Sequence, residues 1–165
     1  MGLLFCAHIG SIPVLLWLAG VDQREHRLPD SGTLGLLAWS YLVSGLVLGP
    51  DSTRHHHAVV AAACVVAALW LLHELPGHPL GFGDVKLGAA LGLQCGWWGI
   101  ETIPFFLAIS FFAGGLIALG LLVTGRLRPR QHIAFGPFLM VGWIFTLVTA
   151  ADGVTFTLDP QELGR

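Results

Sequence analysis

Long apolar stretches fill this chain and constrain its fold more than any other feature. Hydrophobic residues make up 55% of the sequence and charged residues only 11%, and the mean hydropathy is +0.75. A soluble domain carries about 25% charged residues, so burial in lipid explains this composition better than a water-exposed surface does. The length suits one compact bundle. We therefore predict an all-α, polytopic membrane helix bundle.

The apolar stretches are long enough to define individual membrane spans. A spanning helix needs about 20 mostly apolar residues. Six spans are expected on this basis, at residues 3–21, 31–48, 58–75, 85–100, 102–123 and 134–150. The fourth is short and starts in a glycine-rich segment, so we expect it to begin below the membrane surface. Residues 1–151 then form the membrane domain, and residues 152–165 form a polar C-terminal tail.

Basic residues divide unequally between the two faces of the predicted bundle. With six spans, the segments after the first, third and fifth share one face, which carries Arg24, Arg27, Lys86, Arg126, Arg128 and Arg130. The opposite face carries Arg54 and Arg165. Because cytoplasmic loops are enriched in lysine and arginine, we expect the first face to be cytoplasmic and both termini to be extracytoplasmic.

Two aspartates stand at the ends of predicted spans, where a carboxylate is costly and is a functional candidate. Asp22 closes the first span, and Asp84 precedes the fourth, within the segment Gly-Phe-Gly-Asp-Val-Lys at 81–86. Spans two and three lie between them, and an even number of crossings returns the chain to the same face. Both carboxylates are therefore expected at the cytoplasmic edge of the bilayer, where the topology permits them to meet.

Two adjacent carboxylates provide the chemistry of peptide hydrolysis. They share a proton because ionising both is unfavourable, and one pKa rises while the other stays low. The ionised member can activate water as a general base, and the protonated member can polarise a peptide carbonyl. Gly81 and Gly83 permit a positive φ and the close approach of a substrate backbone. This chemistry needs no metal and no cofactor, and we predict neither.

Simpler interpretations stay open for the same residues. Residues 81–83 are also consistent with an interhelix turn in which Asp84 caps the next helix. Asp22 is also consistent with a charge that marks the end of a span. Lys86 is interpreted as an interfacial anchor that can bias the ionisation of Asp84. Asp30, alone or together with the following serine, is expected to be the N-cap of the second span.

The histidines offer little support for a metal site. His73 and His78 are five residues apart, with a proline and a glycine between them, whereas the helical zinc motif needs two histidines four residues apart. The three consecutive histidines at 55–57 are expected in a solvated outer loop. Neither group is predicted to bind a metal.

Three segments, in this order, resemble the motifs of the type IV prepilin peptidases. The first is Asp22 followed by Arg27-Leu28-Pro29-Asp30, the second is Gly81-Phe82-Gly83-Asp84-Val85-Lys86-Leu87, and the third is Phe135-Gly136-Pro137-Phe138-Leu139. The second segment is similar to the GxGD motif of that family, and the third to its late Gly-Pro element. Together the three matches extend over residues 22–139, which is most of the chain.

The resemblance implies a membrane-embedded aspartic endopeptidase. Such an enzyme cleaves the basic leader peptide from type IV prepilin-like precursors, pseudopilins and Flp-type pilins included, at the cytoplasmic face of a bacterial inner membrane. Asp22 and Asp84 would be the catalytic aspartates, and the residues that support the active site would be Gly81, Gly83, Lys86, Arg27, Pro29, Gly136 and Pro137. The expected partners are the precursor peptide and membrane lipid, and no nucleic acid.

The chain resembles the short, peptidase-only members of the family. Longer members have an additional N-terminal cytoplasmic domain, often with paired cysteines, and many of them also N-methylate the new pilin terminus. The cysteines of this chain, Cys6, Cys64 and Cys95, form no such pair in the sequence. N-methyltransferase activity that uses S-adenosylmethionine is therefore not expected.

Two other functions would use the same residue types. A small proton-coupled transporter would use the carboxylates as a proton relay, but it would need polar residues deep within several spans, and the span centres contain almost none. A presenilin-like intramembrane protease shares the GxGD motif, but it would place its other aspartate inside a span after a tyrosine. Asp22 instead follows Val21 at a span end.

Overall fold

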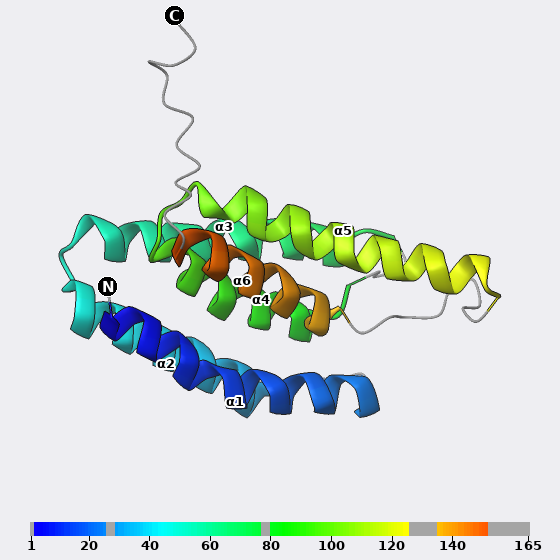
Figure 1. The fold of residues 1–165 in the computed structure, drawn as a ribbon, viewed down its shortest axis with the longest axis horizontal. Coiled ribbons are helices and arrows are strands. Elements are labelled where there is room, and N and C mark those ends of the chain that lie inside the picture. Colours follow the sequence, from blue (N-terminus) through cyan, green and yellow to red (C-terminus); the bar gives the residue numbers. More distant parts are fainter. Residues whose placement is uncertain (1, 26–28, 77–79, 126–134, 152–165) are drawn as a thin grey trace, which may run out of the picture.

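The protein is a bundle of helices (Figure 1). The computed structural model describes residues 2–25, 29–76, 80–125 and 135–151. Within them the elements are α1 (Gly2–Glu25), α2 (Asp30–Leu48), α3 (Thr53–His73), α4 (Phe82–Gly96), α5 (Thr102–Val123) and α6 (Gly136–Ala151). No strand occurs in the described part of the chain. The predicted all-α bundle of about six helices is confirmed, whereas the tail at 152–165 lies outside the described residues.

The helix ends differ from the predicted spans where the two aspartates stand. α5 matches the predicted range at both ends. α1 continues past Asp22 to Glu25, and α4 begins at Phe82, ahead of the predicted start at residue 85. Both aspartates therefore belong to helices, Asp22 to the last turn of α1 and Asp84 to the first turn of α4. Their backbones are held by helical hydrogen bonds and not by loops.

The prediction of a solvated loop at residues 55–57 is wrong. α3 begins at Thr53 because the hydroxyl of Ser52 accepts a hydrogen bond from the backbone N–H of His55, at 3.1 Å, as an N-cap serine does. His55 is buried, and its Nδ1 lies 2.9 Å from Oγ of Ser44 on α2. This contact joins the start of α3 to the end of α2.

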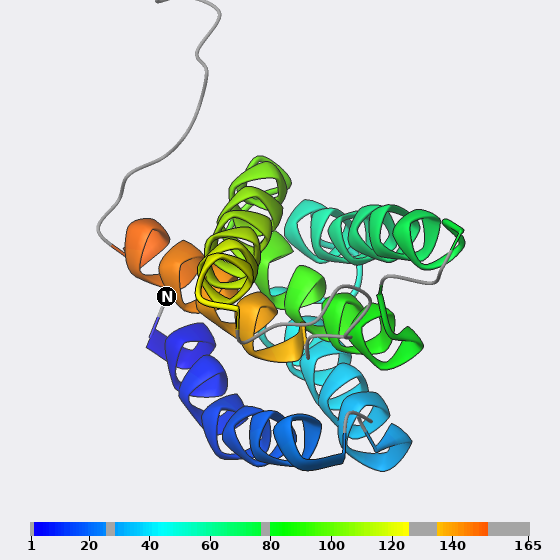
Figure 2. The same ribbon diagram turned by 90° about the vertical axis from the view of Figure 1, so that its right-hand side faces the viewer.

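α4 lies at the centre of the bundle, between α2, α3 and α6 (Figure 2). Its residues from Asp84 to Gly96 are buried, with the exception of Lys86. Glycines allow α3 to approach it closely. A Cβ atom at Gly92 would lie 2.8 Å from Val65, and one at Gly96 would lie 2.5 Å from Ala61. Small residues at such contacts let helix backbones pack tightly in a membrane.

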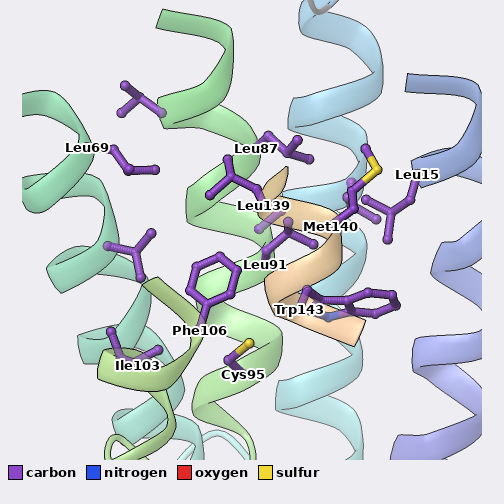
Figure 3. Packing of buried hydrophobic residues seen from close by; sticks show 14 of the residues in the cluster. Leu15, Leu69, Leu87, Leu91, Cys95, Ile103, Phe106, Leu139, Met140 and Trp143 are labelled. Carbon is purple, nitrogen blue, oxygen red and sulfur yellow. The ribbon is translucent and has the colours of Figure 1, made fainter. Parts of the chain in front are cut away.

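The main core connects α4 to α5 and α6. Leucines of α4 and bulky side chains of its neighbours meet there, as Figure 3 shows for Leu87, Leu91, Phe106, Leu139 and Trp143. The side chains of Phe106 and Trp143 are almost fully buried. Because this core holds α6 against α4, the N-terminus of α6 is placed near the N-terminus of α4.

The outer surface is that of a membrane protein. α2, α3 and α5 are long and apolar enough to cross a bilayer, and shorter apolar stretches occupy His8–Asp22 and Gly136–Ala150. Large apolar side chains project outward, among them Leu46 (84% exposed), Val123 (79%) and Phe112 (74%). Such exposure is costly in water and favourable in lipid. The number of spans and their orientation stay predictions.

Candidate active site

Asp22 and Asp84 come together from the ends of two helices. Asp22 is 5% exposed in the last turn of α1, and Asp84 is 7% exposed in the first turn of α4. The two carboxylates are close enough for the charge of Asp22 to influence the ionisation of Asp84. The predicted meeting of these residues at one end of the bundle is therefore confirmed.

Asp84 also caps its own helix. Gly81 is the N-cap of α4, and its carbonyl oxygen accepts a hydrogen bond from the backbone N–H of Asp84 at 3.1 Å. The carboxylate of Asp84 in turn hydrogen-bonds the backbone of Gly81. The second bond is the half of a capping box in which the side chain at the third helical position reaches back to the backbone N–H of the N-cap residue. Two predictions for Asp84 are thus confirmed: it caps its own helix, and it lies close to Asp22.

The glycine at 81 provides space and not an unusual backbone angle. Its φ is −71°, which any residue can adopt, so the expected positive φ does not occur there. A Cβ atom at Gly81 would lie 3.3 Å from Oδ2 of Asp84. Gly83 lies beside Asp84 in the same first turn and is half-buried. Gly81 therefore keeps the approach to the carboxylate open.

The start of α6 completes the site. A Cβ atom at Gly136 would lie 2.8 Å from Oδ2 of Asp22, and the backbone of Gly136 hydrogen-bonds Asp84. Pro137 follows in the first turn of α6, where a proline suits the helix start because its missing N–H leaves no bond unmade. The N-termini of α4 and α6 both point toward the carboxylates, and their partial positive charge stabilises a negative charge on the pair.

The site favours one shared proton near neutral pH. Asp84 precedes the span predicted to begin at residue 85. Burial and, to a smaller extent, the charge of Asp22 raise the pKa of Asp84 from 3.8 to about 7, although backbone hydrogen bonds from Gly81 and Gly136 oppose the rise. Oδ1 of Asp84 is buried and accepts no hydrogen bond from any described residue. It is the atom free to carry the proton or to meet a substrate.

Lys86 binds a residue of another predicted motif. Its Nζ lies 2.5 Å from Oδ1 of Asp30 and 5.0 Å from the centre of the Phe82 ring. The prediction that Asp30 is an N-cap is wrong, because Pro29 occupies that position and Asp30 is the first residue of α2. The ion pair joins the start of α2 to the start of α4. In the sequence, this ion pair is indicated only by the opposite charges of Lys86 and Asp30 on the face predicted to be cytoplasmic.

The connection between α3 and α4 is held by His73. Its Nδ1 lies 2.7 Å from the carbonyl oxygen of Leu80, and its ring lies 5.7 Å from the ring of Phe82. No pattern in the amino-acid sequence indicates this contact, which fixes the chain just before Gly81. His78 lies outside the described residues, as does Arg27. Among the described residues, no three histidine, cysteine, aspartate or glutamate side chains form a group that could hold a metal ion.

Comparison with known proteins gives the family of this chain. Residues 9–119 match the type IV leader peptidase family. The chain belongs to that family. The matched segment includes Asp22 and Asp84 and ends before Gly136, so the family match does not cover the start of α6. No solved structure shows a significant match to the chain.

Relatives within the type IV leader peptidase family cover most of this chain. The prepilin leader peptidase/N-methyltransferase of Burkholderia pseudomallei strain 1026b is 37% identical over 144 residues, which are 86% of this chain and 45% of the relative. The protein of the same name from Escherichia coli K12 is 36% identical over 81% of this chain and 58% of its own length. The chain thus spans about half the length of these two relatives.

A shorter relative matches over most of its own length. Leader peptidase HopD of Escherichia coli is 35% identical over 155 residues, which are 81% of this chain and 86% of HopD. Its name contains the peptidase alone, whereas the names of the two longer relatives add an N-methyltransferase. This difference is compatible with the expected peptidase-only form.

Proposed function

We propose that this chain is an aspartic endopeptidase that cleaves the basic leader peptide from type IV prepilin-like precursors. One observation carries the proposal: Asp22 and Asp84 are buried side by side and share the neighbour Gly136. Membership of the type IV leader peptidase family supports the reaction class. The names of the relatives support the choice of a prepilin precursor as substrate.

The geometry suggests separate roles for the two carboxylates. Asp84 holds the shared proton at Oδ1, because burial disfavours its ionised form, and Asp22 is the charged general base. Asp22 takes a proton from water as the water oxygen attacks the scissile carbonyl carbon, and Asp84 donates its proton to the carbonyl oxygen. When the tetrahedral intermediate breaks down, the proton on Asp22 passes to the leaving amine, and the hydroxyl proton returns to Asp84.

The position of the pair suits a substrate that is itself a membrane helix. A prepilin-like precursor has a basic leader followed by a long apolar helix. In our proposal the helix lies in the bilayer beside the bundle, and the leader stays at the cytoplasmic face of a bacterial inner membrane. The scissile bond then reaches the end of the bundle where α1 ends and α4 and α6 begin. Residues 1–151 form the catalytic membrane domain, and 152–165 a tail.

Co-expression with a prepilin-like precursor tests this function. The precursor is purified, and its N-terminus is analysed by mass spectrometry. The wild-type chain should remove the leader, whereas Asp22→Asn and Asp84→Asn should leave it intact at normal membrane levels of the protein. Asp51→Asn is the matched control, because Asp51 is exposed in the turn between α2 and α3. Normal processing by both active-site variants would contradict the proposal.

The same spectra report on methylation. A peptidase-only enzyme leaves a free amine on the first residue of the mature pilin. An N-methyltransferase adds the mass of one methyl group to it. We expect the unmodified mass, and a methylated terminus would show that the second activity named for the longer relatives is present as well.

A further inference from the structure

Gln94 is a buried polar residue at the opposite end of the helix that carries Asp84. Its side chain is completely buried, and its Nε2 donates hydrogen bonds to Oγ of Ser11 on α1, at 3.0 Å, and to Oγ of Ser40 on α2, at 2.7 Å. Both serines are also buried. The expectation that the span centres contain almost no polar groups is therefore wrong at this level of the bundle. Three helices meet there through one amide.

A second contact strengthens the connection between α1 and α4. Nε2 of His8 lies 3.4 Å from the backbone carbonyl oxygen of Gln94. The His8 ring is 2% exposed and packs edge-on against Trp97, with ring centres 4.7 Å apart. Two neighbouring turns of α1 are thus bonded to the same residue of α4.

α1 depends on such contacts more than the other helices do. It packs chiefly against α2 and, to a smaller extent, against α6. In lipid no hydrophobic force drives helices together, and buried polar residues can fix the register of packed helices. Pro13 also removes a backbone N–H from α1 near Ser11. Directional bonds at Ser11 therefore have a large influence on where α1 sits along α4.

A shift at this level reaches the active site through the helices. Asp22 and Ser11 lie on one continuous helix, and so do Asp84 and Gln94. At about 1.5 Å of rise per residue, the first pair is separated by about 16.5 Å and the second by about 15 Å. If α1 slides or turns against α4 at Ser11, Asp22 moves relative to Asp84 by a similar amount.

We propose that Gln94 is a positioning residue, which holds α1 in register with α4 through Ser11 and so keeps Asp22 and Asp84 in the geometry of a proton-sharing pair. This inference rests on the proposed function. Gln94 itself touches neither carboxylate, because it lies near the other end of α4. Its effect passes through Ser11 and α1.

Two serine variants separate positioning from general stabilisation. Ser11→Ala and Ser40→Ala each remove one buried hydroxyl that accepts a hydrogen bond from the same amide nitrogen. Only Ser11 lies on the helix of Asp22. We expect Ser11→Ala to lower kcat for leader cleavage by about tenfold or more, with KM unchanged, because small misplacements of catalytic groups are costly. Ser40→Ala should keep the wild-type kcat. Ser11→Thr retains a hydroxyl at this position, so its kcat should be close to that of the wild type.

The pH profile gives a second measurement. Separating Asp22 from Asp84 weakens the repulsion between them, so the loss of activity at alkaline pH should move to lower pH in Ser11→Ala and not in Ser40→Ala. Among the described residues, the other charged or titratable side chains at this end are Asp30, His73, Glu74 and Lys86, and Arg24 and Glu25 follow Asp22 in the sequence. None of them is changed in these variants, and α5 and α6 contain no ionisable side chain.

A distance measurement tests the register without activity. Spin labels are placed at Trp17→Cys on α1 and Phe82→Cys on α4, both exposed positions, after the exposed Cys6 and Cys64 are replaced by serine. We expect the distance distribution to shift or broaden in Ser11→Ala and to stay unchanged in Ser40→Ala. Equal behaviour of the two variants, in the distances and in kcat, would overturn the inference. If the wild type cleaved no precursor while the distances changed as expected, the proposed function would fail and the positioning of α1 by Gln94 would stand.

Discussion

Gly136 lies directly against Asp22: a Cβ atom at residue 136 would come within 2.8 Å of Oδ2 of Asp22. The backbone of the same glycine hydrogen-bonds Asp84. The start of α6 is thus part of the carboxylate site, although it lies far from both aspartates in the sequence. The close contact explains why a glycine precedes Pro137 at this point.

Gly136→Ala should lower activity without preventing folding. The added methyl group meets the flexible end of Asp22, which can move aside, but the moved carboxylate no longer faces Asp84 correctly. We expect kcat for leader cleavage to fall by about tenfold or more, with normal amounts of protein in the membrane. Gly120→Ala on α5 is the matched control, because a Cβ atom there meets nothing within 4 Å. An unchanged kcat in Gly136→Ala would show that Asp22 needs no fixed position.

Cleavage should fall as the pH rises above about 7. The mechanism needs a proton on Asp84, and the pKa of Asp84 is raised to about 7 chiefly by burial. Initial rates of leader cleavage between pH 5 and pH 9 provide the measurement. A rate that keeps increasing through this range would show that a protonated Asp84 is not required.

Stability should depend on pH through the same group. Because the pKa of Asp84 in the folded protein lies above its ordinary value of 3.8, ionising it destabilises the fold. Its contribution to stability is complete below about pH 4 and is lost as the pH rises through about 7. The melting temperature of the wild type should therefore decrease over this interval more than that of Asp84→Asn. Parallel melting curves for the two proteins would contradict the raised pKa.

The ion pair between Lys86 and Asp30 should influence cleavage through its geometry more than it influences the folding stability of the protein. Asp30 is largely exposed, so the pair contributes at most about 1 kcal/mol to folding. Lys86→Asp should strongly reduce cleavage, because it places a second negative charge two residues from Asp84. Adding Asp30→Lys restores an ion pair with the charges exchanged and should recover part of the rate. A double variant no faster than Lys86→Asp would show that the pairing itself is unimportant.

Gly92 should control assembly of the bundle and not catalysis. A side chain there meets Val65 at 2.8 Å and the backbone of Ala62 at 3.4 Å. Gly92→Leu should lower the stability by about 1–3 kcal/mol or more, as overpacking does, and thermal melting in detergent measures it. Gly120→Leu faces open space and should melt like the wild type. Equal melting temperatures for the two leucine variants would place the contact between α3 and α4 in doubt.

Hydropathy and charge predict the helices and the meeting of the two aspartates. The number of crossings between Asp22 and Asp84 puts both at one end, and the structure confirms this placement. The exact ends were harder to predict, because Asp22 and Asp84 are polar and lower the apolar score of the turns that contain them. Both residues nevertheless lie inside helices, where capping and helical hydrogen bonds hold them.

Pairings between distant polar residues could not be predicted in the same way. A hydropathy pattern scores each residue alone, so it gives no indication that Gln94 bonds Ser11, or that Lys86 bonds Asp30. The same limitation affects His55, because its polarity predicts a loop although its side chain is buried against Ser44. Such contacts depend on how helices are rotated against each other, and the core side chains decide that rotation.

The most direct test of the account measures cleavage by purified protein in ¹⁸O-labelled water. The substrate is a prepilin-like precursor, and the proteins are the wild type, Asp22→Asn, Asp84→Asn and the exposed control Asp51→Asn. We predict that the wild type and the control release a leader with one ¹⁸O atom in its new carboxylate, and that both active-site variants release none. Leader release by Asp22→Asn and Asp84→Asn at the wild-type rate would contradict the claim that these carboxylates activate water.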